Sequence, residues 1–92
     1  MSAIKLKDGF VVQKVGGSYL AVAVGERADE FNALIRMNET GAFLWEKLAE
    51  SELAEDALVG VLRAEYEVGE DIARNDVKRF VEQLERGGLL EV

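Results

Sequence analysis

The glycine pair Gly16-Gly17 separates two short runs, residues 10–15 and 18–24, that are rich in β-branched and aromatic residues. This arrangement indicates a tight β-hairpin, because both central positions of a type I′ turn need a positive φ, which glycine adopts freely. Residues 33–37 form a third short apolar run, and the polar residues 25–32 before it predict a loop. We therefore expect a three-stranded antiparallel meander, which is too small to be stable without covering helices.

The residues after this meander have the spacing of amphipathic helices. Asn38 is a favourable N-cap for a helix that ends near Ala49, and Ser51 predicts the N-cap of a second helix. On the first helix we expect Trp45 in the core, because large aromatic side chains dominate small cores. Gly41 weakens a helix relative to alanine, so we expect it to allow close packing against the sheet.

A third helix is predicted to start near Glu70–Ile72 and to end at Gly87-Gly88, which is a C-cap signal. Leu89-Leu90 would then return to the core. The expected element order is βββααα, an α+β fold formed by a single domain over residues 1–92. The apolar stripe of the third helix consists of Ala73, Val77, Phe80, Val81 and Leu84.

The 92 residues include no histidine and no cysteine. The commonest general base, the commonest nucleophile and the usual zinc ligands are therefore missing. A carboxylate pair needs an enclosing pocket to shift its pKa for acid–base chemistry, and a domain of this size rarely has one. We therefore expect a binding protein without catalytic residues, metal or cofactor, rather than an enzyme.

The chain has 18 acidic and 11 basic residues, which give a formal net charge of −7. Residues 50–76 account for all of it, with nine acidic residues against Arg63 and Arg74. Such a surface repels phosphate backbones, and we interpret it as a solvated helical face that maintains solubility. No apolar run could span a membrane and no signal peptide is recognisable, so we expect a cytoplasmic protein.

The third strand is expected at an edge of the meander. An edge strand presents unpaired backbone N–H and C=O groups, which proteins usually protect with lysine, proline or a bulge. In residues 33–37, Arg36 is the only charged residue and the others are apolar. The edge is therefore either an aggregation liability or a docking site for an added peptide strand.

The stretch Leu34–Trp45, an apolar strand followed by Asn-Glu-Thr-Gly and an aliphatic-aromatic helix, resembles the PqqD family (coenzyme PQQ synthesis protein D). The similarity extends over nearly the whole chain, with Lys7–Phe10 as the opening, Glu65–Val68 as the exit of the second helix and Phe80–Leu90 as the ending. The resemblance implies a winged-helix-like fold that recognises ribosomally made, post-translationally modified peptides. The sequence resembles the broad family more than the dedicated member of the PQQ pathway.

Members of this family bind the leader of a precursor peptide and present it to a modifying enzyme, often a radical S-adenosylmethionine protein. The resemblance implies that the leader adds as a strand beside the third strand, in a groove closed by the third helix. The peptide-binding residues expected there are Leu34, Ile35, Arg36, Met37, Arg74, Val77, Lys78 and Val81. Two other functions stay open, a winged-helix DNA-binding regulator and a non-catalytic subunit of a larger enzyme, and so does a homodimer.

Charged residues flank the apolar stripe of the third helix. Arg74 and Lys78 lie on one rim, and Asp76 and Gln83 lie on the other. If the basic rim faces the third strand, these two cations and Arg36 favour a leader with Glu or Asp beside its apolar anchors. Alternatively, Arg74 and Lys78 pair with nearby surface acids such as Glu70 and Asp71. A further alternative is that the opposite rim faces the strand.

Overall fold

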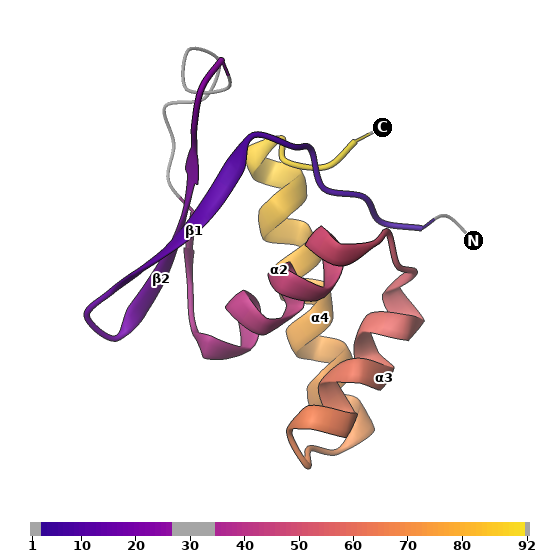
Figure 1. Cartoon of the computed structure of the whole chain (residues 1–92). Helices are drawn as coiled ribbons and strands as arrows, with labels where there is room; N and C mark the ends of the chain where they lie inside the picture. The colour runs from indigo at the N-terminus through magenta and orange to yellow at the C-terminus, as the bar shows by residue number, and fades with distance from the viewer. Residues whose placement is uncertain (1–2, 27–34, 92) are drawn as a thin grey trace.

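The computed structural model describes residues 3–26 and 35–91. Its antiparallel sheet has the order β1-β2-β3, with β3 at one edge, which confirms the predicted meander (Figure 1). The strands are β1 (Phe10–Val15), β2 (Ser18–Ala23) and β3 (Ile35–Met37). Ala33 and Leu34, the first two residues of the predicted third strand, lie outside the described residues, as does most of the predicted loop.

The hairpin turn differs from the predicted type. Val15 and Ser18 are the last paired residues of β1 and β2, so Gly16 and Gly17 make the whole connection. Gly16 has a φ of 63°, whereas Gly17 does not have a positive φ. A positive φ at the first central position only is the pattern of a type II′ turn, so the prediction of type I′ is wrong.

Three helices follow β3 and complete the βββααα order of an α+β fold. They are α2 (Glu39–Glu50), α3 (Glu55–Glu65) and α4 (Glu70–Gly87). Asn38 caps α2 as predicted, because its side-chain oxygen accepts a hydrogen bond from the Gly41 amide at 2.8 Å. Gly88 follows α4 in the left-handed conformation with a φ of 74°, in agreement with the predicted C-cap signal.

Ser51 does not cap α3, contrary to the prediction. It ends α2 instead, where its amide donates to the Lys47 carbonyl, and α3 starts only at Glu55. The reason is Leu53, which forms a β-bridge with Ile4 through backbone hydrogen bonds of 2.7 and 3.1 Å. This pairing between distant residues keeps the segment extended, and a local capping preference cannot anticipate it.

The N-terminal segment also pairs with the end of the chain. Leu6 forms a second bridge with Leu90, and the Lys7 amide donates to the Leu89 carbonyl at 2.8 Å. Leu89 is 3% exposed, so the chain does return to the core after α4, as expected. The segment therefore joins the α2–α3 connection to the residues that follow α4.

The helices lie on one side of the sheet and enclose the core with it (Figure 1). Trp45 is 6% exposed and Leu44 is fully buried, which confirms the core position predicted for Trp45. A Cβ at Gly41 would come within 3.1 Å of the Met37 Cβ, so glycine lets α2 pack closely against the end of β3. The predicted stripe of α4 is buried throughout: Ala73, Val77, Phe80, Val81 and Leu84.

Candidate functional site

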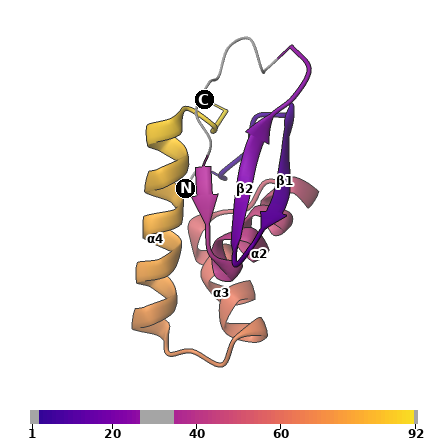
Figure 2. The same cartoon turned by 90° about the vertical axis from the view of Figure 1, so that its left-hand side faces the viewer.

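β3 lies between β2 on one side and α4 on the other (Figure 2). The Gln83 side chain of α4 shows which backbone groups of β3 face the helix, because its Nε2 donates a hydrogen bond to the Arg36 carbonyl oxygen at 2.9 Å. In an antiparallel ladder, the N–H and C=O of one residue point to the same side, and this side alternates along the strand. Arg36 therefore presents both groups to the free edge, whereas Ile35 and Met37 pair with β2.

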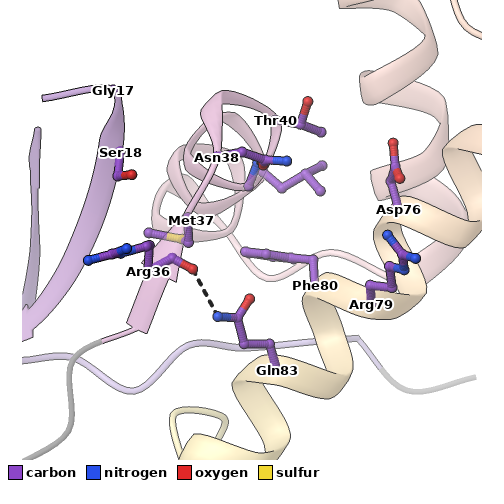
Figure 3. A pocket seen from close by; sticks show the side chains of 12 residues that line it. Gly17, Ser18, Arg36, Met37, Asn38, Thr40, Asp76, Arg79, Phe80 and Gln83 are labelled. Carbon is purple, nitrogen blue, oxygen red and sulfur yellow. Dashed lines mark hydrogen bonds between the residues drawn. The ribbon is translucent and has the colours of Figure 1, made fainter.

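A pocket of about 350 Å³ lies beside this edge, between β3, the start of α2 and α4 (Figure 3). Its lining combines buried apolar side chains with more exposed polar side chains of α4. The apolar ones are Met37, Leu44 and Phe80, and the polar ones are Asp76, Arg79 and Gln83. We call the free edge at Arg36 and this pocket together the β3–α4 groove. It can pair with an extended backbone and accept an apolar side chain that has charged groups beside it.

The residues predicted on the third strand differ in what they offer to the groove. Leu34 lies outside the described residues. Ile35 and Met37 are 6% and 4% exposed, so their side chains belong mainly to the core. Arg36 is exposed, but Figure 3 shows its guanidinium on the β2 side, away from α4. The contribution of β3 to the groove is therefore mostly its backbone.

The two valines predicted on the helix lie in the core. Val77 is fully buried and Val81 is 7% exposed, and neither lines the pocket. Phe80, which belongs to the same apolar stripe, does line it. Periodicity places these three side chains together, and only the packing of α4 in the folded protein distinguishes the one that reaches the groove.

Arg74 lies against α3 rather than β3. Its Nη1 is 2.9 Å from Asp56 Oδ1, and its Nε is 2.9 Å from Glu70 Oε2. These two hydrogen bonds raise the pKa of the Arg74 guanidinium above its ordinary value. Lys78 is exposed and does not line the pocket. The opposite rim of α4, with Gln83, faces β3, so the three cations considered from the sequence do not come together in the groove.

Three residues that line the pocket are not among the predicted binding residues: Arg79, Phe80 and Gln83. Together with Asp76 they have the spacing i, i+3, i+4 and i+7, which places them on one face of a helix. That spacing is the signal that could have found them. It could not show that this face, and not the one with Arg74, meets the strand.

The fold and the groove together define a small α+β binding domain with an accessible strand edge. The family model for coenzyme PQQ synthesis protein D (PqqD) matches residues 18–90, and the chain belongs to this family. Among solved structures, it is similar to one described as TbiB1 in complex with the TbiA(beta) leader peptide. The TM-score is 0.70 at 21% sequence identity, with 95% of this chain and 94% of that chain covered, so the two share a fold. No curated protein matches the chain.

Within residues 3–26 and 35–91, no group of three or more acidic side chains is placed to hold a metal ion. In the same part of the chain, none of the helices has the length and apolar character needed to span a membrane.

Proposed function

We propose that this protein binds the leader region of a ribosomally synthesised precursor peptide by strand addition in the β3–α4 groove and presents it to a modifying enzyme. Membership of the PqqD family supports this function, as does the shared fold with TbiB1, whose structure contains a leader peptide. The observation that carries the proposal is the orientation of Arg36, whose backbone N–H and C=O face the groove. An extended peptide that pairs with these groups continues the sheet.

The pocket beside Arg36 would select the side chains of the added strand. Alternate side chains of a strand point to the same face, so one of them would enter the pocket and contact Phe80 and Met37. Next to that apolar anchor, Asp76 would then favour a basic residue of the peptide and Arg79 an acidic one. In this proposal Val77 and Val81 support the groove from the core, and Arg74 and Lys78 have no contact with the peptide.

We also propose that the protein acts by binding alone and that the partner enzyme, such as a radical S-adenosylmethionine protein, carries the cofactor and the chemistry. The sequence has no histidine or cysteine to serve as a base or a nucleophile. A precursor peptide is made in the cytoplasm, which is where we place this single-domain binding protein.

Replacing Arg36 in two ways tests strand addition. Arg36→Pro removes the N–H that faces the groove, and proline is tolerated in an edge strand when its nitrogen faces outward. Arg36→Ala is the matched control, because it deletes the side chain and keeps the N–H. The probes are linear peptides selected from a random displayed library on the wild-type protein, and calorimetry gives their affinities.

We expect Arg36→Pro to weaken groove-bound peptides roughly 2- to 12-fold, the equivalent of one net hydrogen bond of about 0.5–1.5 kcal/mol. Arg36→Ala should leave their affinity nearly unchanged. Ile35→Pro is less informative, because the Ile35 amide pairs with β2 and its loss would damage the sheet. If a folded Arg36→Pro variant binds every selected peptide as tightly as the wild type, strand addition at β3 is wrong.

A further inference from the structure

A second cleft, of about 720 Å³, lies between the β-hairpin and α2. We call it the hairpin cleft, and it shares no lining residue with the pocket of the β3–α4 groove. Within the sheet, α2 contacts β2 and β3 more than β1, where Phe10 meets Trp45 edge to face and the rest of the strand is less covered. Val12 illustrates this, because it pairs with the fully covered Ala21 of β2 and yet remains partly exposed.

Aromatic side chains from β1, β2, α2 and the end of α3 line the hairpin cleft. Phe43 of α2 and Tyr66 at the end of α3 meet edge to face, with ring centroids 5.5 Å apart. The Lys14 Nζ lies over the ring of Tyr19 in β2, 5.7 Å from its centroid. The Lys47 Nζ lies over the Phe43 ring, 5.4 Å from its centroid. Since Tyr19, Phe43 and Tyr66 are all only partly buried, a cation of a ligand can stack on Tyr66 or take the place of a lysine over the other two rings.

Carboxylates form one side of the same cleft. Glu39, Glu46 and Glu50 lie along α2 on the face that also carries Phe43. Glu50 is 4.0 Å from Lys47, but Glu39 and Glu46 have no basic side chain within ion-pair distance among the described residues.

The Tyr66 hydroxyl reports the same negative surroundings. Its partial burial raises the pKa of this group above the ordinary value, and the carboxylates of Glu39 and Glu65 raise it further. A second copy of this chain, with a net charge of −7, would be repelled from such a surface. The combination of apolar rings and unpaired carboxylates instead matches a ligand that is both apolar and cationic.

We propose that the hairpin cleft docks a segment of a partner protein in which arginine or lysine flanks an apolar or aromatic residue. The apolar side chain would lie among the rings, and the cations would pair with Glu39 and Glu46. Arginine fits best, because its planar guanidinium can stack on an aromatic ring and also bind a carboxylate through two hydrogen bonds. Since the two sites share no lining residue, a leader peptide and this partner could be held at the same time.

A peptide selection tests the docking site and needs no candidate partner. A displayed library of random linear peptides is selected on the wild-type protein, and the bound peptides are then sorted by their loss of affinity for Glu39→Gln/Glu46→Gln. This double variant keeps the size of both side chains and removes their charges. Glu82→Gln/Glu85→Gln is the matched control, because it removes two exposed charges from α4 outside both sites.

We expect a class of peptides rich in arginine or lysine next to apolar residues, which the cleft variant weakens roughly fivefold or more and the control variant leaves unchanged. These peptides should bind Arg36→Pro normally and should not compete with peptides that Arg36→Pro weakens. The docking site is wrong if no selected peptide responds specifically to the cleft variant, or if the responding peptides lack basic residues. Failure of strand addition would appear separately, as insensitivity of all peptides to Arg36→Pro.

Discussion

Gln83 occupies the backbone acceptor that an added strand needs. Its Nε2 donates to the Arg36 carbonyl oxygen at 2.9 Å, so a peptide N–H must displace it to continue the sheet. Gln83→Met keeps the length of the side chain and removes the donor. We expect this variant to bind groove peptides roughly 2- to 12-fold more tightly, because a competing hydrogen bond of about 0.5–1.5 kcal/mol no longer has to be broken.

Calorimetry compares the affinity of groove peptides for Gln83→Met and Gln83→Ala with their affinity for the wild type. Gln83→Ala also removes the donor, but it adds no apolar group to the groove. Tighter binding by both variants would support displacement of the amide. Weaker binding by both would mean that Gln83 contacts the peptide directly and does not compete with it.

Gly41 and Gly60 give a paired prediction about packing. Both lie in helices, but a Cβ at Gly60 would have no heavy atom within 4 Å, whereas a Cβ at Gly41 would lie 3.1 Å from the Met37 Cβ. Gly60→Ala should stabilise the protein by up to about 1 kcal/mol through helix propensity. Gly41→Ala should destabilise it by about 1 kcal/mol or more. The new methyl group would crowd the Met37 Cβ, which is attached to the β3 backbone and cannot move aside easily.

Urea unfolding of the two alanine variants measures this difference. An equal gain in stability for both would show that the corner between β3 and α2 has more room than the structure gives it.

The sequence could predict the role of Gly41, since glycine after an N-cap needs a packing reason. It could also predict the pairing of Arg74 with Glu70, four residues away on the same helix, but not the pairing with Asp56, which lies 18 residues away on another helix.

At the scale of elements, the β3–α2 corner depends on the cap at Asn38. The Asn38 side chain accepts from the Gly41 amide, and the residue directly follows β3. Asn38→Ala should lower the free energy of unfolding by about 1 kcal/mol, and Asn38→Asp should retain most of it, because aspartate also caps and favours the helix N-terminus. Thermal unfolding compares them. Equal losses for both variants would mean that the asparagine side chain matters for a reason other than capping.

The elements differ in how well the sequence predicts them. The bounds of α4 follow from a long apolar stripe and a terminal glycine pair, both of which are local signals. The start of α3 does not, because Leu53 is held in a bridge with Ile4 from the opposite end of the chain. The same limit applies to the site. Strand order predicts the free edge of β3, whereas the rotation of α4 that brings Gln83 to Arg36 depends on how the helices pack.

At the scale of the whole molecule, the negative charge gathers where α3 meets α4. Residues 50–76 carry a net charge of −7, and two cations join the helices there: Arg74 pairs with Asp56 of α3, and Arg63 of α3 pairs with Glu70 of α4. Arg74→Glu would replace two ion pairs with repulsion from Asp56 and Glu70. We expect a lower melting temperature at low salt that added salt partly restores, because ions screen repulsion between exposed charges.

The same substitution separates stability from recognition. Arg74 is turned to α3, so Arg74→Glu should leave the affinity of groove peptides unchanged once the protein is folded. Arg79 lines the pocket and is exposed, so Arg79→Glu should change their affinity and its salt dependence while leaving the melting temperature nearly unchanged. Titration of both variants with one acidic groove peptide checks the pair of outcomes. Loss of binding in Arg74→Glu but not in Arg79→Glu would mean that the opposite rim of α4 faces the peptide.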